Sequence, residues 1–64
     1  MNDEQKQELT MVLELLHTTI VKNHISMATD GNGNILFFDT AEYLDKKDVK
    51  KCNGLSVNVQ DLVV

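Results

Sequence analysis

Apolar residues recur every three or four positions in the segment 2–23, which is typical of an amphipathic helix. Asn2 or Asp3 can cap its start, and Asp3 and Glu4 bring negative charge to the positive end of the helix dipole. We expect the apolar stripe to cover one face of a β-sheet. The residues of the stripe are Leu9, Val12, Leu13, Leu16 and Ile20.

Two further apolar residues of this helix, Met11 and Leu15, lie more than a quarter turn from the stripe. They form a small apolar patch on the side that should face solvent. Single apolar residues are common on protein surfaces, whereas a chain this short gains from a subunit contact. The patch therefore has two interpretations of equal weight, ordinary exposure or a contact between subunits.

The segment 24–40 has two stretches that can be extended on either side of a glycine-rich turn, which predicts a β-hairpin. Asn32 and Gly33 suit a two-residue type I′ turn, because both tolerate positive φ. That register pairs Met27 with Phe38. A three-residue loop that also takes in the preceding glycine is the competing register, and it exchanges the phenylalanine opposite Met27. In either register both faces of the hairpin are apolar and need cover.

The hairpin turn also has part of the spacing of a calcium-binding loop. Asp30, Asn32 and Asn34 fall at its first, third and fifth positions. The sixth position needs glycine and holds Ile35, and the twelfth needs glutamate and holds Ala41. The spacing therefore favours a turn over a metal site.

A second, short helix follows the hairpin. Asp39 and Glu42 have the spacing of a capping box, with aspartate in place of the usual serine or threonine. We expect the helix to begin at Thr40 or the next residue, to end at about Lys47, and to turn Leu44 inward.

A cluster of lysines follows, interrupted by Asp45 and Asp48. It is a candidate docking patch for an acidic partner, but the small local net charge favours a solvated helix face. The cluster consists of Lys46, Lys47, Lys50 and Lys51.

The C-terminal part predicts a turn at Asn53-Gly54, because both residues accept positive φ. The alternation of apolar and polar residues from Leu55 to Gln60 then predicts a half-buried strand. The last four residues can extend the strand or coil into one turn. Since the sequence ends in Leu62, Val63 and Val64 with no polar tail, we expect this segment to pack in the core or against a second chain.

These elements predict a single α+β domain over residues 1–64, in the order α-β-β-α-β. The antiparallel sheet would have about three strands and pack against the N-terminal helix. In an alternative arrangement, Val49 to Cys52 form a fourth strand that pairs with Leu55 to Asn58 through a turn at Asn53-Gly54.

Composition narrows the classes of partner. The chain has 64 residues, a net charge of −4, six lysines and no arginine. Arginine is the side chain best suited to bidentate contact with phosphate or guanine, so specific nucleic-acid binding is disfavoured. The lone Cys52, with no apolar segment of membrane-spanning length and no leader sequence, predicts a cytoplasmic protein with no membrane partner. Lysine without arginine, together with six asparagines, suggests a low-GC bacterium or its phage.

No catalytic, cofactor-binding or metal-binding residue is predicted. Cys52 has no histidine near it in the sequence that could act as a base. On a continuous helix His17 and His24 would lie about 10 Å apart along the axis, too far to share a metal ion. Gly31 and Gly33 resemble the start of a dinucleotide fingerprint, but they lead into a strand instead of a helix.

The sequence therefore predicts a small, non-enzymatic protein-binding protein, regulatory or inhibitory and homodimeric. A chain of this length buries only about 60% of its unfolded surface, so self-association would add stability. An assembly subunit that mainly contacts copies of itself is the alternative. A weaker one is an acidic inhibitor of a nucleic-acid enzyme. The candidate interface residues are Met11, Leu15, Val63 and Val64.

Overall fold

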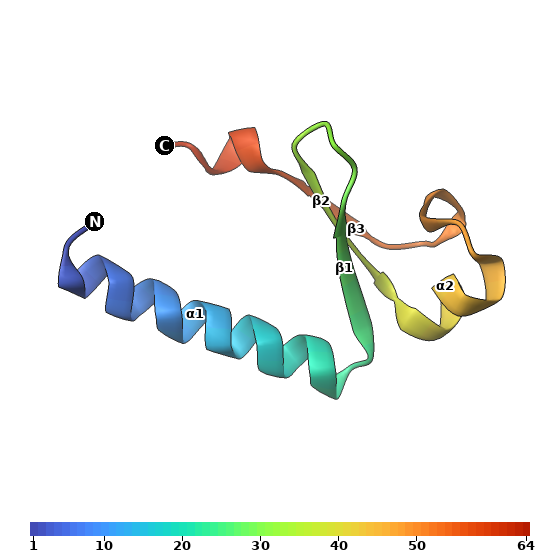
Figure 1. The fold of residues 1–64 in the computed structure, drawn as a ribbon, viewed down its shortest axis with the longest axis horizontal. Coiled ribbons are helices and arrows are strands. Elements are labelled where there is room, and N and C mark those ends of the chain that lie inside the picture. Colours follow the sequence, from blue (N-terminus) through green and yellow to red (C-terminus); the bar gives the residue numbers. More distant parts are fainter.

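The structure, a computed structural model that describes residues 1–64, has two α-helices and a three-stranded antiparallel sheet in the order β1-β2-β3 (Figure 1). This confirms the predicted small α+β fold and the element order α-β-β-α-β. The elements are α1 (Asp3–Lys22), β1 (Ile25–Thr29), β2 (Asn34–Asp39), α2 (Thr40–Lys46), the 3₁₀ turn η1 (Val49–Lys51), β3 (Leu55–Asn58) and the 3₁₀ turn η2 (Val59–Leu62).

Local hydrogen bonds determine where α1 begins and ends. The side chain of Asn2 accepts from the backbone N–H of Gln5 at 2.7 Å, and the side chain of Gln5 accepts from the N–H of Asn2 at 2.9 Å. This reciprocal pair satisfies two N–H groups that the first turn of a helix leaves free. After Lys22 the chain turns into β1 through His24, whose φ is 54°.

The hairpin adopts the three-residue loop, so the predicted type I′ register is wrong. Met27 is opposite Phe37, not Phe38. The reason is the Asp30 side chain, which accepts from the backbone N–H groups of Asn32 at 2.7 Å and Asn34 at 3.2 Å. These bonds hold a loop in which Gly31 and Gly33 both have positive φ, at 83° and 84°. No side chain with a Cβ would accept that geometry so easily.

The register defines two faces of the sheet. The face toward α1, here called the inner face, carries Ile25, Met27, Thr29, Ile35, Phe37, Leu55 and Val57. The face toward α2, here called the outer face, carries Ala28, Leu36, Phe38 and Ser56.

The outer face is covered by α2 and η1. Asp39 caps α2 by accepting from the N–H of Glu42 at 2.8 Å, as the sequence predicts. Tyr43 lies against Phe38, with ring centroids 5.3 Å apart, and Phe38 is the one buried residue of the chain. Leu44, expected to point inward, is exposed, because the helix turns Tyr43 to the sheet in its place.

The segment before β3 forms η1, so the alternative fourth strand is absent. The expected reason for glycine at position 54 is also wrong, since neither Asn53 nor Gly54 has positive φ. A Cβ on Gly54 would instead collide with the carbonyl group of Phe37. Gly54 therefore lets β3 approach the backbone of the central strand closely.

The molecule is elongated and thin, with Cα extents of 43 × 27 × 13 Å. α1 packs against β1 near its C-terminal end, where Leu16 and Ile20 are half-buried, and its N-terminal half extends away from the sheet (Figure 1). The stripe thus covers only one end of the inner face. Residues Leu9, Val12 and Leu13 of the same stripe remain exposed.

Candidate functional site

An apolar cleft lies between α1 and the inner face of the sheet. It has a volume of about 430 Å³. We call it the inner cleft, and it is lined by Leu16, Thr19, Ile20, Ile25, Phe37, Asp39, Asn53, Gly54 and Leu55.

Apolar residues extend from this cleft across the sheet. Met27, Phe37 and Leu55 are consecutive cross-strand neighbours, so they form one row on the inner face. Leu55 is 66% exposed and Met27 53% exposed. Because β1 and β3 are the two edges of the sheet, the row is exposed at both ends, although Phe37 is half-buried and borders α1 at the inner cleft.

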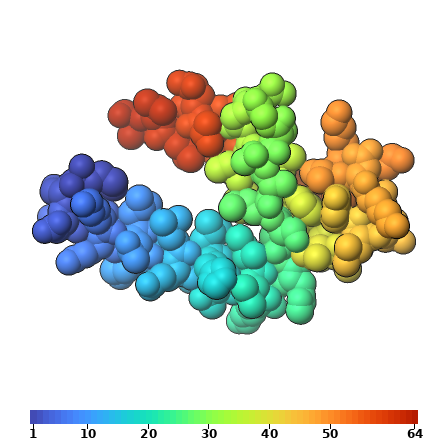
Figure 2. Space-filling view, in the orientation of Figure 1, coloured from blue at the N-terminus to red at the C-terminus, as the bar shows by residue number.

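Beyond the inner cleft the molecule opens into a wedge, seen in Figure 2 between the N-terminal half of α1 and the C-terminal segment. The exposed part of the α1 stripe, with Val12 at 59%, continues the line of Leu16 and Ile20 along the helix. At the other side of the wedge, η2 is held to the hairpin because the N–H of Val59 donates to the carbonyl of Gly33 at 2.8 Å. The wedge therefore has apolar residues on α1 and on the sheet.

The four candidate interface residues from the sequence are all exposed. Met11 and Leu15 lie on α1 away from the stripe that faces the sheet. Val63 and Val64 follow η2, across the wedge from α1 (Figure 1). The tail coils instead of extending the strand, and it is not packed in the core of its own chain. The structure thus places these residues on two separate elements.

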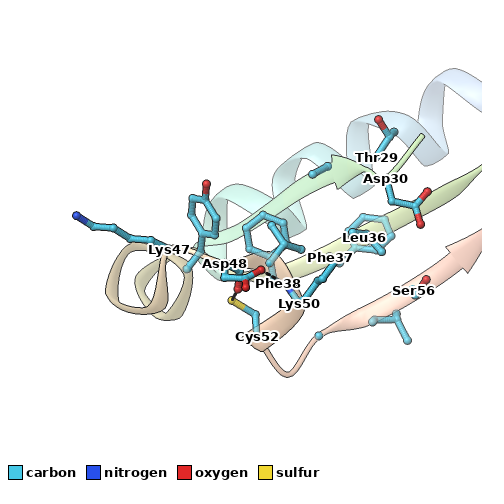
Figure 3. Close-up of a pocket in the computed structure, with 15 residues that line it drawn as sticks. Thr29, Asp30, Leu36, Phe37, Phe38, Lys47, Asp48, Lys50, Cys52 and Ser56 are labelled. Carbon is cyan, nitrogen blue, oxygen red and sulfur yellow. Dashed lines mark hydrogen bonds between the residues drawn. The ribbon is translucent and has the colours of Figure 1, made fainter. Parts of the chain in front are cut away.

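A second cavity, of about 570 Å³, lies between the outer face and the segment from α2 to η1 (Figure 3). Leu36, Phe38 and Tyr43 provide much of its apolar wall. Lys47 also borders it, but its ammonium group points away from the other side chains (Figure 3). This cavity combines an apolar wall with charged groups from one short segment.

Cys52 is the one nucleophilic thiol at this cavity. Its Sγ donates to the carbonyl oxygen of Asp48 at 3.5 Å. Burial raises the pKa of the Cys52 thiol, and the nearby Glu42 carboxylate raises it further against the opposing effect of Lys46. The group is therefore held as a thiol, the less nucleophilic form, at neutral pH.

The four lysines of the cluster differ in their contacts. Lys46 forms an ion pair with Glu42 at 3.7 Å and donates to the carbonyl of Lys51 at 3.1 Å. Lys47 ends α2 in a left-handed conformation with a φ of 54°. All four lysines are exposed, and only Lys46 has a carboxylate partner. The candidate docking patch thus consists of three free ammonium groups beside one that is tied to its own helix.

The hairpin loop uses its polar side chains internally. In addition to its two backbone donors, Asp30 accepts from the side-chain amide of Asn34 at 2.7 Å. The Asn34 amide and the N–H of Asn32 hold the pKa of the Asp30 carboxyl below its ordinary value. His17 and His24 are exposed, and no group of three or more His, Cys, Asp or Glu side chains gathers anywhere in the chain.

No protein-family model, curated protein or solved structure matches this chain. None of its helices has both the length and the apolar character that crossing a membrane requires. The functional argument therefore rests on the surfaces of the molecule.

The candidate interface residues from the sequence do not define the wedge, because Met11 and Leu15 lie on the side of α1 away from it. A 20-residue helix is about 30 Å long, whereas three strands spaced about 4.8 Å apart span only about 10 Å. The stripe on α1 is therefore longer than a sheet of this width can cover. The lengths of the predicted helix and strands could therefore have indicated that part of the α1 stripe has no partner in its own chain.

Proposed function

We propose that the chain is a small, non-enzymatic protein-binding protein, with a regulatory or inhibitory role, that acts as a homodimer. The observation that supports this is its exposed area. The single chain exposes 5506 Å², whereas a compact folded monomer of 7.2 kDa exposes about 4,100 Å². The chain therefore exposes about 1,400 Å² more than its mass requires.

That excess has the size of a protein interface. Stable interfaces bury about 800 Å² per partner, and those of obligate homodimers bury more. Only one residue of 64 is buried, so the contacts of α1 and α2 with the sheet enclose almost no core. A second copy would cover apolar residues that these contacts leave exposed.

The dimer would leave the outer face free for another protein. The cavity beside Phe38 and Tyr43 offers an apolar wall, and Lys47 and Lys50 border it together with the carboxylates of Asp30 and Asp48. A partly apolar partner segment that brings an acidic side chain to one of these lysines fits this combination. The raised pKa of Cys52 favours binding over nucleophilic catalysis at this place.

One observation favours the assembly-subunit alternative. Both edge strands, β1 and β3, have no neighbour on their outer side. Open edges can pair with strands of other chains, and heterologous pairing continues without closing. An assembly subunit would use these edges to form larger species.

Sedimentation equilibrium of the intact chain from micromolar to millimolar concentration tests the proposal. We expect one species of twice the 7.2 kDa chain mass over this range. A species of 7.2 kDa at all concentrations would contradict the dimer, and a series of growing oligomers would favour the assembly subunit.

Partner binding needs a separate measurement. Tagged protein would be used to capture proteins from the lysate of its native organism, beside a Lys50→Glu variant and a Lys6→Glu control with the same charge change on α1. We expect one stoichiometric partner that Lys50→Glu loses and Lys6→Glu keeps. Recovery of the tagged protein alone would contradict the proposed binding of a second protein. Turnover of a metabolite by the purified chain would contradict the non-enzymatic role.

A further inference from the structure

We propose that the wedge is filled by a second copy of this chain, whose α1 lies antiparallel to α1 with its N-terminal half against the inner face of the sheet. This inference rests on the proposed homodimer and specifies its surface. The exchange is reciprocal, because each copy has the same helix and the same wedge.

The first argument is the match between what each copy exposes and what each copy leaves open. Leu9, Val12 and Leu13 of α1 are exposed although they belong to the stripe that packs on the sheet further along. Met27 and Leu55 are exposed on the sheet face that this stripe reaches. Packing the exposed helix residues of one copy against the exposed sheet residues of the other removes both groups from water. A single contact would therefore explain why both groups are exposed in one chain.

The second argument is size. A surplus of about 1,400 Å² per chain exceeds the roughly 800 Å² that each partner of a stable complex buries. The two-residue patch of Met11 and Leu15 is far smaller than the 20 or so residues that such an interface usually takes from each side.

The third argument fixes the direction of the helices. The N-terminal half of α1 carries Asp3, Glu4 and Glu8 against a single Lys6, whereas the last turn carries Lys22. A parallel pair would bring the two acidic halves together. An antiparallel pair places each acidic half beside the end that carries Lys22 and aligns the helix dipoles in opposite directions.

Two-fold symmetry then gives the register. α1 runs from Asp3 to Lys22, so its midpoint lies between Val12 and Leu13. An axis at this point relates Leu9 to the partner's Leu16 and Val12 to the partner's Leu13. All four positions belong to the apolar stripe, so this register brings stripe against stripe along the helix pair.

Disulfide formation between introduced cysteines tests this arrangement. In a Cys52→Ser background, which leaves one thiol per chain, we would prepare Leu13→Cys, Leu9→Cys and Met11→Cys. Two copies of position 13 lie about 2 Å apart along the antiparallel pair, and two copies of position 9 about 10 Å apart. A disulfide needs Cα atoms within about 7 Å, so the antiparallel pair permits only the first.

We expect Leu13→Cys to form covalent dimers at least about tenfold faster than the other two variants under mild oxidation at micromolar concentration. Leu9→Cys is the control for the relative direction of the two α1 helices, because in a parallel pair it would form the disulfide as fast as Leu13→Cys. Met11→Cys is the control for the opposite side of α1. Circular dichroism and sedimentation of the reduced proteins check the fold. If Leu13→Cys itself disturbs the dimer, Val12→Cys takes its place across the midpoint.

The outcomes separate this inference from the proposed function. A reduced dimer in which Met11→Cys or Leu9→Cys links as fast, or in which no variant links, would overturn the wedge arrangement and leave the homodimer standing. A chain that is monomeric by sedimentation at millimolar concentration would overturn both.

Discussion

Replacing Gly54 by alanine should destabilise the fold although the backbone angle at this position is ordinary. The added Cβ would collide with the carbonyl oxygen of Phe37 and lie 3.1 Å from its carbonyl carbon and 3.4 Å from the Cα of Phe38. All three are backbone atoms of β2, the central strand, which is hydrogen-bonded on both sides. No flexible side chain can move aside, so β3 itself must shift.

The size of the effect follows from this geometry. Overpacking of this kind costs about 1–3 kcal/mol, and we expect the upper part of this range because only backbone atoms can yield. A chain of this length has a urea m-value of about 1 kcal/mol/M, so the midpoint should fall by about 2 M. The melts must be made at one fixed protein concentration, since dimerisation would couple to unfolding.

Gly31→Ala is the matched control. Gly31 has a φ of 83° and nothing within 4 Å of an added Cβ, so its substitution costs only backbone strain, about 1 kcal/mol. Gly54→Ala should therefore lower the urea midpoint more than Gly31→Ala. The reverse order would show that β3 does not lie as close to Phe37 as the structure places it.

Four further predictions concern the loop, the thiol and the lysines. Gly33→Val should lower the free energy of unfolding by roughly 1–2 kcal/mol, because its φ is 84°; an unchanged denaturant midpoint would contradict the positive φ at this position. The folded-state pKa of Asp30 lies below the unfolded value of about 4, so its contribution is present above that pH and declines as the pH falls through the folded value. Thermal melts between pH 7 and 2 should therefore show a steeper loss for the natural protein than for Asp30→Asn, and parallel losses would refute this. Cys52 should react with iodoacetamide at pH 8 more slowly in the folded than in the urea-unfolded chain, because partial burial raises its pKa; equal rates would contradict this raised pKa. Lys50→Glu should leave the free energy of unfolding within about 0.5 kcal/mol of the natural value, since its side chain is exposed and unpaired; a larger loss in urea melts would give it a structural role.

The elements that the sequence predicted well are those with local causes. α1 begins at the Asn2 cap and α2 at the Asp39 cap because each side chain bonds to an N–H three residues later. β3 follows from simple alternation of apolar and polar residues. In each case the contacts that determine the element lie within a few positions along the chain. The residue pattern alone is therefore enough to predict them.

The hairpin register and the role of Gly54 depend on contacts that residue preferences do not reveal. Asn32-Gly33 suits a type I′ turn, yet the Asp30 carboxylate binds the loop N–H groups and selects one more loop residue. That shift moves Phe37 to the inner face and Phe38 to the outer face. Gly54 is required by a neighbour 17 positions away in the chain, so no local rule for glycine could identify the reason.

The candidate site was hardest to predict because it is defined by what the chain leaves uncovered. The stripe from Leu9 to Ile20 predicted a helix that packs on the sheet, and the structure confirms the contact of α1 with β1. Only the relative lengths of helix and sheet decide how much of the stripe remains free, and here about half of it does. With one buried residue, the chain's own core is small against the apolar burial that a stable domain of this length needs. In the proposed homodimer, the exposed half of α1 and the exposed row on the sheet would be two parts of one core that is completed between chains.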